Sequence, residues 1–191
     1  MVTPHRDTAE LPATYVDYRT VDFKKDRKIA ILIQTVFLAV ALLAIAVALL
    51  FELPLASDWH PVVTIIVTVL AGLVYMAAHE ATHGVILRLL TGAKPSYRFR
   101  FPFLTTSISI YLTRRSVITT ALAPCVIWGV VLLVALFLVP PEARLTVYVV
   151  LALNFAGSAG DYIEATLALR QPPRTLLQDD ADRIHIFRPA S

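Results

Sequence analysis

Three ionisable residues lie within the sequence His79-Glu80-Ala81-Thr82-His83, inside a stretch that is otherwise apolar. On a helix, residues four positions apart share one face, so the imidazoles of His79 and His83 can bind the same metal ion. Glu80 then lies beside them, where its carboxylate can act as a general base toward water. This HExxH spacing is typical of zinc hydrolases and predicts a zinc-dependent hydrolytic site with Glu80 as the catalytic residue.

Two plainer interpretations of the same residues stay open at this point. In the first, His79 and His83 are a hydrogen-bonded polar pair in the interior of a helix, although burying either imidazole in a membrane without a partner costs free energy. In the second, Glu80 is an interfacial carboxylate paired with Arg88 or with arginines of the next loop. Both alternatives would leave the stretch without chemistry.

The composition is that of a membrane protein. Of the 191 residues 57% are hydrophobic, and the mean hydropathy of +0.69 is too high for a soluble domain. The net charge of +3 does not indicate a nucleic-acid partner, because the basic residues are sorted by loop, as membrane topology requires. The single cysteine, Cys125, excludes a disulfide framework and is expected to be a small buried apolar residue.

Four apolar stretches are long enough to cross a bilayer. We therefore expect an all-α integral membrane protein with transmembrane helices at residues 29–51, 62–90, 117–139 and 145–169. Pro124 lies inside the third stretch and predicts a kink there. The expected organisation is a polar N-terminal segment at residues 1–28, a membrane domain at residues 29–170 and a polar C-terminal tail at residues 171–191.

The loop between the second and third predicted helices, residues 93–116, alternates between polar and apolar residues. Polar Ser96, Arg98 and Arg100 alternate with aromatic residues, and after Pro102 the alternation resumes over residues 107–113. A period of two on both sides of a proline-containing turn predicts a β-hairpin. An irregular juxtamembrane loop is the alternative, because the turn lacks an Asn-Gly pair.

The distribution of Lys and Arg predicts the orientation. These residues number six in residues 1–28, five in residues 91–116 and four in residues 170–191, whereas the loops on the opposite side hold only Arg144. By the positive-inside rule, both termini and the predicted hairpin face the cytoplasm, in a multi-pass protein of the cell membrane.

A further ionisable residue lies at the depth of the histidines. With about 1.5 Å per residue, His79 is about 26 Å and Asp161 about 24 Å from the outer ends of their helices. An aspartate inside a membrane costs about 2.5–3.5 kcal/mol on insertion scales, so Asp161 needs a partner, which a shared divalent metal would supply. Asn154 and Ser158 lie on the same helical stripe as Asp161.

Other polar residues are expected to stay outside the site. Glu164, one turn beyond Asp161, is expected to be a solvated interfacial charge and not a fourth ligand. Gly157 and Gly160 allow either close packing of helices or local loosening around a ligand. Solvated positions are also expected for two further groups, namely the acidic run at Asp179, Asp180 and Asp182, and His5, His60 and His185.

With these residues identified, the chain resembles the intramembrane zinc metalloproteases of the site-2 protease type, and more closely the membrane protein family named Putative zincin peptidase. The resemblance covers residues 29–170 loosely and rests on HExxH in one membrane helix and an Asn-to-Asp segment in a later one. It implies Zn2+ as the cofactor, with ligands His79, His83 and Asp161 and with Glu80 as the catalytic carboxylate. Asn154, with Ser158 beside it, would bind substrate or an oxyanion.

The Asn-to-Asp segment departs from the NxxPxxxLDG pattern of site-2 proteases. Asn154 and Asp161 are seven positions apart and not eight, the proline is absent, and Gly160 precedes the aspartate instead of following it. The assignment of the third ligand therefore rests on depth as well as on the pattern.

The expected function is zinc-dependent cleavage of membrane-spanning proteins or peptides near the cytoplasmic face. A substrate must be extended to expose its carbonyl groups, and an edge strand of the hairpin is placed to pair with it. The alternatives are a metal-binding or metal-transporting membrane protein, and a silent scaffold that would not require Glu80. Expected partners are the substrate and the lipid bilayer but no nucleic acid, and the oligomeric state stays open.

Overall fold

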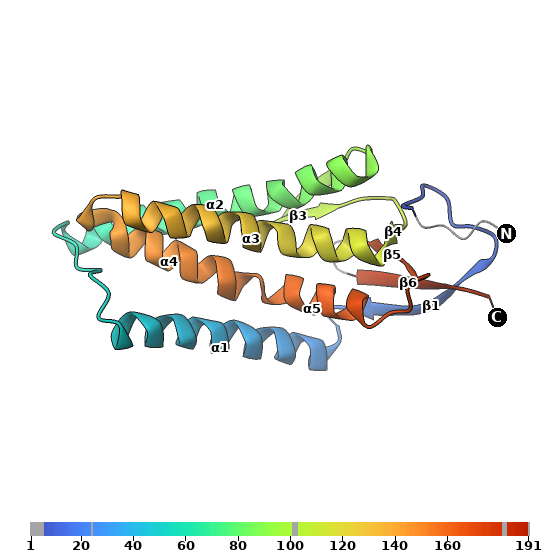
Figure 1. Cartoon of the computed structure of the whole chain (residues 1–191), viewed down its shortest axis with the longest axis horizontal. Coiled ribbons are helices and arrows are strands. Elements are labelled where there is room, and N and C mark those ends of the chain that lie inside the picture. The colour runs from blue at the N-terminus through green and yellow to red at the C-terminus, as the bar shows by residue number, and fades with distance from the viewer. Residues whose placement is uncertain (1–5, 24, 101–102, 181–182, 191) are drawn as a thin grey trace.

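The structure, a computed structural model, describes residues 6–23, 25–100, 103–180 and 183–190. Figure 1 shows the helices side by side along the long axis, with the four-stranded sheet at one end and the loop between the first two helices at the other. The elements in chain order are β1 (Tyr15–Asp22), α1 (Arg27–Leu50), α2 (Pro61–Thr91), β2 (Ser96–Arg100), β3 (Phe103–Ser107), β4 (Leu112–Thr113), α3 (Arg114–Leu138), α4 (Pro141–Gly157), α5 (Ala159–Leu169), β5 (Leu176–Asp179) and β6 (Arg183–Pro189).

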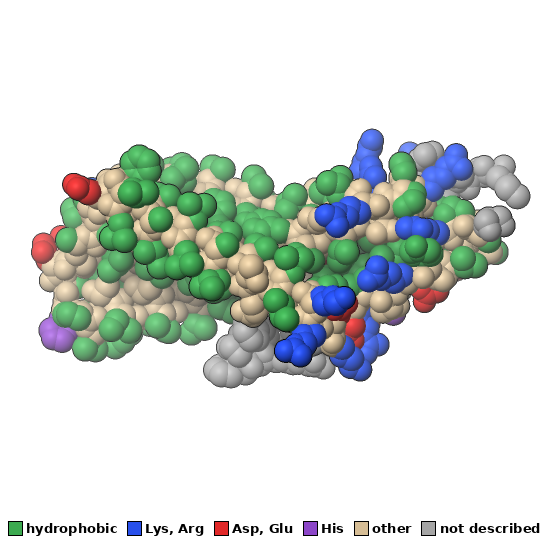
Figure 2. All heavy atoms as spheres, turned by 90° about the horizontal axis from the view of Figure 1, so that it is seen from below, with side chains coloured by type: hydrophobic (Ala, Val, Ile, Leu, Met, Phe, Trp, Pro, Cys, Tyr) green, Lys and Arg blue, Asp and Glu red, His purple; other side chains and the backbone are tan. Residues whose placement is uncertain are grey.

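The helices α1, α2, α3 and the combined α4–α5 are each long and apolar enough to cross a membrane, which confirms the four predicted spans. α1 has no buried residue, and large apolar side chains are exposed on the outside of the bundle. Such a surface is unfavourable in water but is the surface that a bilayer covers. Hydrophobic side chains cover the body of the molecule in Figure 2, while Lys and Arg gather at the end with the strands.

Local sequence signals define where α2 begins and ends. Pro61 occupies its first turn, preceded by His60, whose ring nitrogen accepts a hydrogen bond from the backbone N–H of Val62. Gly92 ends the helix with a φ of 71°, a left-handed conformation that favours glycine. The HExxH residues therefore lie in the second half of α2, toward the end of the bundle that carries the strands.

The fourth predicted helix is two helices, α4 and α5, separated at Ser158. The hydroxyl of Ser158 donates to the backbone carbonyl of Asn154 over 2.9 Å. An added Cβ at Gly157 or Gly160 would meet no atom within 4 Å, so neither glycine serves close packing between helices. These weak helix formers allow the local break instead, and the break places Asp161 in the first turn of α5.

The prediction of an all-α fold needs a correction, because both terminal segments contribute to one four-stranded antiparallel sheet in the order β1-β6-β5-β4. β1 pairs with β6 from Tyr15 opposite Pro189 to Asp22 opposite Arg183. The segments that sequence analysis treated as a separate lead-in and tail are thus partners. In Figure 1, β1 and β6 lie side by side at this end of the bundle.

One face of this terminal sheet packs on the ends of the helices. Ile184 and Ile186 of β6 are each 1% exposed and join a core cluster with Leu87 of α2 and Val117 of α3. Burying such aliphatic side chains is worth about 1.5–3 kcal/mol each. The sheet and the helical bundle therefore share one hydrophobic core at this end of the molecule.

The predicted β-hairpin is confirmed for β2 and β3, which pair from Ser96 opposite Ser107 to Arg100 opposite Phe103. Its turn, residues 101–102, lies outside the described residues. The second strand ends at Ser107, earlier than the alternation over residues 107–113 predicted, because Leu112 and Thr113 of β4 pair with β5 instead. β3 runs beside α2, which brings the hairpin to the HExxH segment.

Candidate metal centre

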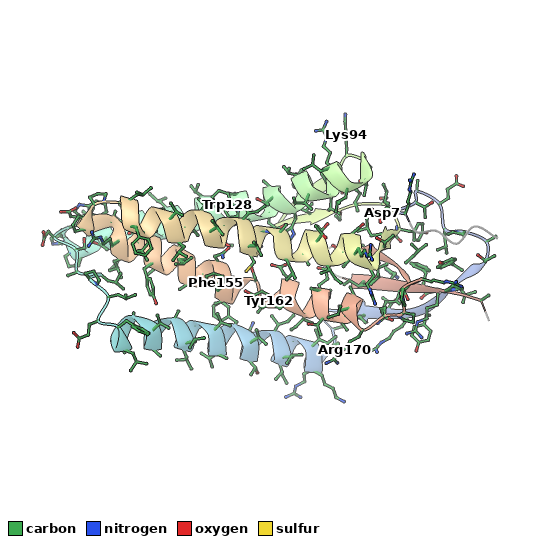
Figure 3. The ribbon with its side chains drawn as sticks, viewed as in Figure 1. Asp7, Lys94, Trp128, Phe155, Tyr162 and Arg170 are labelled. Carbon is green, nitrogen blue, oxygen red and sulfur yellow. The ribbon has the colours of Figure 1, made fainter. Side chains whose placement is uncertain are left out.

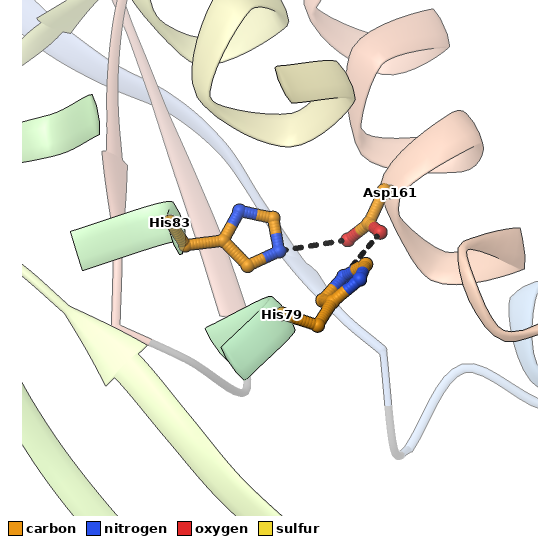
Figure 4. Close-up of side chains that lie close together, drawn as sticks. All are labelled: His79, His83 and Asp161. Carbon is orange, nitrogen blue, oxygen red and sulfur yellow. Dashed lines mark hydrogen bonds and ion pairs between the residues drawn. The ribbon is translucent and has the colours of Figure 1, made fainter. Parts of the chain in front are cut away.

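Three donor side chains from two helices converge between α2 and α5. His79 Nε2 lies 3.3 Å from Asp161 Oδ2, and His83 Nε2 lies 3.5 Å from Asp161 Oδ1. Their ligand atoms all lie within 4.8 Å of one another, and the side chains are only 12–18% exposed. Figure 4 shows both imidazoles directed at the one carboxylate.

The spacing of these atoms fits a zinc ion. Zinc ligands lie about 2.0–2.2 Å from the metal, so two ligands at a tetrahedral angle are about 3.4 Å apart. The two His–Asp separations, 3.3 Å to Oδ2 and 3.5 Å to Oδ1, are close to this value, and one ligand atom from each of the three residues lies within 4.8 Å of the others. Two nitrogens and a carboxylate oxygen are also the donor types that zinc prefers.

Hydrogen bonding argues against a metal-free ion cluster at this position. His83 Nδ1 lies 2.9 Å from the backbone carbonyl of Thr120, which can only accept, so Nδ1 carries a proton. A hydrogen bond from Nε2 to Asp161 would then require a doubly protonated, charged ring in a membrane helix. With the neutral ring, the Nε2 lone pair faces Asp161, and a cation between the two groups removes the repulsion.

Glu80 is held beside the donors by the hairpin. The Thr106 hydroxyl of β3 lies 3.0 Å from the backbone carbonyl of Glu80 and 3.2 Å from its Oε2. Gly84, one turn further along α2, leaves the space that the Tyr97 ring of β2 occupies, since an added Cβ would overlap that ring. The hairpin therefore approaches α2 closely and orients the Glu80 carboxylate.

A cavity of about 230 Å³ opens beside the donors. It is lined by side chains that include Glu80, His83, Thr106, Asp161, Glu164 and Asp179. A larger cleft of about 570 Å³ lies between the hairpin and the terminal sheet, and it shares only Asp179 with the cavity. Two of the donors, His83 and Asp161, line the smaller cavity, whereas the larger cleft contains none of the donors.

The predicted site residues separate into two groups. The structure brings His79, His83 and Asp161 together, with Glu80 beside them, whereas their roles stay predictions. Asn154 and Ser158 are both 0% exposed, with the Asn154 amide bonded to protein groups on both sides. The role of these two in binding substrate stays a prediction.

Two acidic residues that were expected to be solvated line the cavity instead. Glu164 follows Asp161 by one turn of α5 and points the same way, and Asp179 reaches the cavity from β5 because the terminal sheet closes this end of the bundle. The remaining described histidines lie elsewhere: His60 caps α2, and His185 contacts Thr20 in the sheet.

Three contacts of the site are not among those that the sequence predicts, namely those of Tyr75, Thr106 and the Thr120 carbonyl. The Tyr75 hydroxyl lies 2.8 Å from His79 Nδ1. Its position four residues before His79, on the same helical face, was a usable signal. Thr106 gave no such signal, because its contact with Glu80 depends on how the hairpin folds back along α2.

A bundle of membrane-spanning length that holds two histidines, an aspartate and an adjacent glutamate has the features of a metal-dependent hydrolase. The chain matches the family described as "Putative zincin peptidase" over residues 72–177, more than half of its length, and it belongs to that family. The matched region contains all three donors and Glu80, which supports zinc as the metal. No curated protein and no solved structure gives a significant match.

Proposed function

We propose that this protein is an intramembrane zinc endopeptidase of the site-2 protease type, which hydrolyses peptide bonds of membrane-embedded substrates near the cytoplasmic face. The observation that carries the proposal is the His79–His83–Asp161 donor set with Glu80 beside it, all on helices of membrane-spanning length. A zincin-type peptidase in this setting meets its substrates within or at the edge of the bilayer.

The proposed orientation has both termini and the hairpin in the cytoplasm of a cell-membrane protein. It is supported by the Lys and Arg residues at the end with the strands, shown in Figure 2 and by the labelled Lys94 and Arg170 in Figure 3. The pairing of β1 with β6 supports this arrangement, because paired strands lie on one side of a membrane.

In the proposed mechanism, metal binding, proton transfer and orientation of the base are carried out by different side chains. His79, His83 and Asp161 would hold the metal, which when bound supplies a Lewis acid that polarises the scissile carbonyl. Glu80 accepts the proton of the attacking water and passes it to the leaving amine. Thr106 keeps the Glu80 carboxylate turned toward the cavity in which that transfer takes place.

This role of Thr106 gives a first prediction. Thr106→Val keeps the shape of the side chain but removes the hydroxyl, and a hydrogen bond to a charged group is worth about 1.5–3 kcal/mol. We expect kcat to fall by roughly 10- to 150-fold with zinc content unchanged, as measured by cleavage assays and metal analysis.

Ser107→Ala is the matched control for Thr106→Val, because the Ser107 hydroxyl contacts Ser96 and not Glu80. It should leave kcat at the parent value. Full activity in Thr106→Val, or an equal loss in Ser107→Ala, would show that the hydroxyl does not orient the base.

The substrate is proposed to add as an extended strand to the hairpin. Among the described residues β2 pairs only with β3, so its other edge offers backbone groups to a further strand. Phe99→Pro removes one N–H from β2, and cleavage of membrane substrates is expected to fall severalfold, with Phe99→Ala as the control that keeps the N–H. Unchanged cleavage of every substrate by Phe99→Pro would refute strand addition.

The proposed function is tested with purified protein reconstituted in vesicles together with a panel of single-span membrane proteins. We expect about one zinc per chain, cleavage near the cytoplasmic end of some spans, loss of cleavage with a zinc chelator, and recovery on adding zinc. Zinc uptake into the vesicles without any cleavage would instead support the transporter alternative.

A further inference from the structure

We propose that Tyr75 and Pro124 are positioning residues, which fix the rings of His79 and His83 with Nδ1 protonated and Nε2 free for the metal. The inference rests on the proposed zinc site but concerns the residues behind it. A metal-binding histidine needs a hydrogen-bond partner at the ring nitrogen that does not bind the metal. That partner decides which of the two nitrogens is protonated and which offers its lone pair to the metal.

The proton on His79 follows from a chain of hydrogen bonds that begins at α3. The backbone carbonyl of Cys125 can only accept, so the Asn154 group that faces it at 2.9 Å is the Nδ2 amide. Asn154 Oδ1 then faces the Tyr75 hydroxyl at 2.8 Å and accepts its only proton. The remaining contact of that hydroxyl, with His79 Nδ1 at 2.8 Å, therefore has His79 as the donor.

The proton on His83 depends on a proline. In an α-helix the carbonyl of residue 120 would accept from the backbone N–H of residue 124, but Pro124 has no N–H. The Thr120 carbonyl is thereby released, and it accepts from His83 Nδ1 over 2.9 Å. Pro124, predicted only as a kink, thus supplies the acceptor that orients the second ligand.

Burial makes both arrangements rigid. Asn154 is fully buried, Tyr75 is 8% exposed, and Pro124 is among the most buried side chains. Gly129 of α3 faces Asn154, and an added Cβ there would lie 3.3 Å from the amide nitrogen. The hydrogen bonds that orient His79 and His83 both lead to backbone carbonyls of α3, those of Cys125 and Thr120. This one helix therefore sets the orientation of both histidines without providing a ligand.

The first test is Tyr75→Phe, which removes the acceptor of His79 and keeps the ring. Loss of such a supporting partner typically lowers metal affinity by about 10- to 100-fold, and we expect a zinc Kd raised by this factor in a competition titration. Tyr148→Phe is the matched control, because its hydroxyl bonds the Ala44 carbonyl away from the site. It should leave the Kd unchanged.

Asn154 should act through Tyr75. We expect Asn154→Ala to weaken zinc binding, and the Tyr75→Phe/Asn154→Ala double variant to bind zinc no more weakly than the worse of the two single variants. Fully additive losses of zinc affinity would show that Asn154 acts on the site independently. They would remove Asn154 from the series of hydrogen bonds that leads through Tyr75 to His79.

The second test is Pro124→Ala, which restores a helical N–H that competes for the Thr120 carbonyl. The helix should become more regular, so the thermal unfolding midpoint should not fall, while the zinc Kd rises severalfold. An unchanged Kd would remove Pro124 from the proposal. A merely structural proline would show the opposite pattern, with stability changed and affinity retained.

The decisive readout is the tautomer of each ring, measured by NMR on metal-free protein with ¹⁵N-labelled histidine. We expect Nδ1–H for His79 and His83 in the parent, and loss of this preference at His79 alone in Tyr75→Phe. An Nε2–H ring in the parent, or no change in Tyr75→Phe, would overturn the inference. Because no metal or substrate is present, this result stands apart from success or failure of the proposed peptidase function.

Discussion

Replacement of Glu80 by glutamine is expected to abolish peptide cleavage while the protein keeps its zinc. Glutamine has the shape of glutamate and can still accept the Thr106 hydrogen bond, but it cannot take a proton from water. General-base catalysis contributes about 10²–10⁴-fold in rate, so kcat should fall by this factor, equivalent to about 3–5 kcal/mol of transition-state stabilisation. Zinc should remain, because Glu80 is not one of the three converging donors.

The measurement compares Glu80→Gln with the parent for metal content and for cleavage of the same reconstituted substrate. Retained zinc with lost cleavage supports the peptidase. Undiminished cleavage by Glu80→Gln would refute the assignment of the base. Loss of both zinc and cleavage would show that Glu80 belongs to the donor set.

The second large effect is expected for Asp161→Asn, which should lose zinc. Zinc sites with four protein ligands bind with about 10–16 kcal/mol, or about 3–4 kcal/mol per ligand, so loss of one ligand should raise the Kd by roughly 10²–10³-fold. Cleavage should fall in proportion to occupancy and recover in part at high zinc. The metal-free variant should be no less stable than the parent, because the substitution removes a charge from a membrane helix.

Glu164→Gln is the matched control for Asp161→Asn. Glu164 lies one turn further along α5 and lines the same cavity, but it is outside the converging donor set. We expect its zinc Kd to match that of the parent. A comparable loss of affinity in Glu164→Gln would make Glu164 a ligand and require a different donor set.

The parts that sequence alone predicted are those with a local signal. The four spans follow from runs of apolar residues, and the HExxH pair from helical spacing. The depth of Asp161 in the membrane follows from the number of residues between it and the outer end of its predicted helix, because an α-helix has a fixed rise per residue. The break at Ser158 does not alter this depth enough to separate Asp161 from His79 and His83.

The parts that were missed depend on contacts between distant segments. Ile184 and Ile186 alternate with polar residues as a strand should, yet Thr20 and His185, paired across β1 and β6, are 165 positions apart. No local pattern specifies such a partner. Asn154 was linked to substrate through a motif, whereas its full burial behind Tyr75 was visible only in three dimensions.

The terminal sheet also determines the order in which the molecule can be completed. Its strand β1 precedes all of the helices in the sequence, and its partner β6 follows all of them. The helices can enter the bilayer one after another during synthesis, but β1 has no partner until residues 183–189 have left the ribosome. Asp179 of the adjoining strand β5 lines one side of the cavity beside the donors. The cavity beside the donors is therefore enclosed on this side only after the residues of β5 and β6 have been made and the sheet has formed.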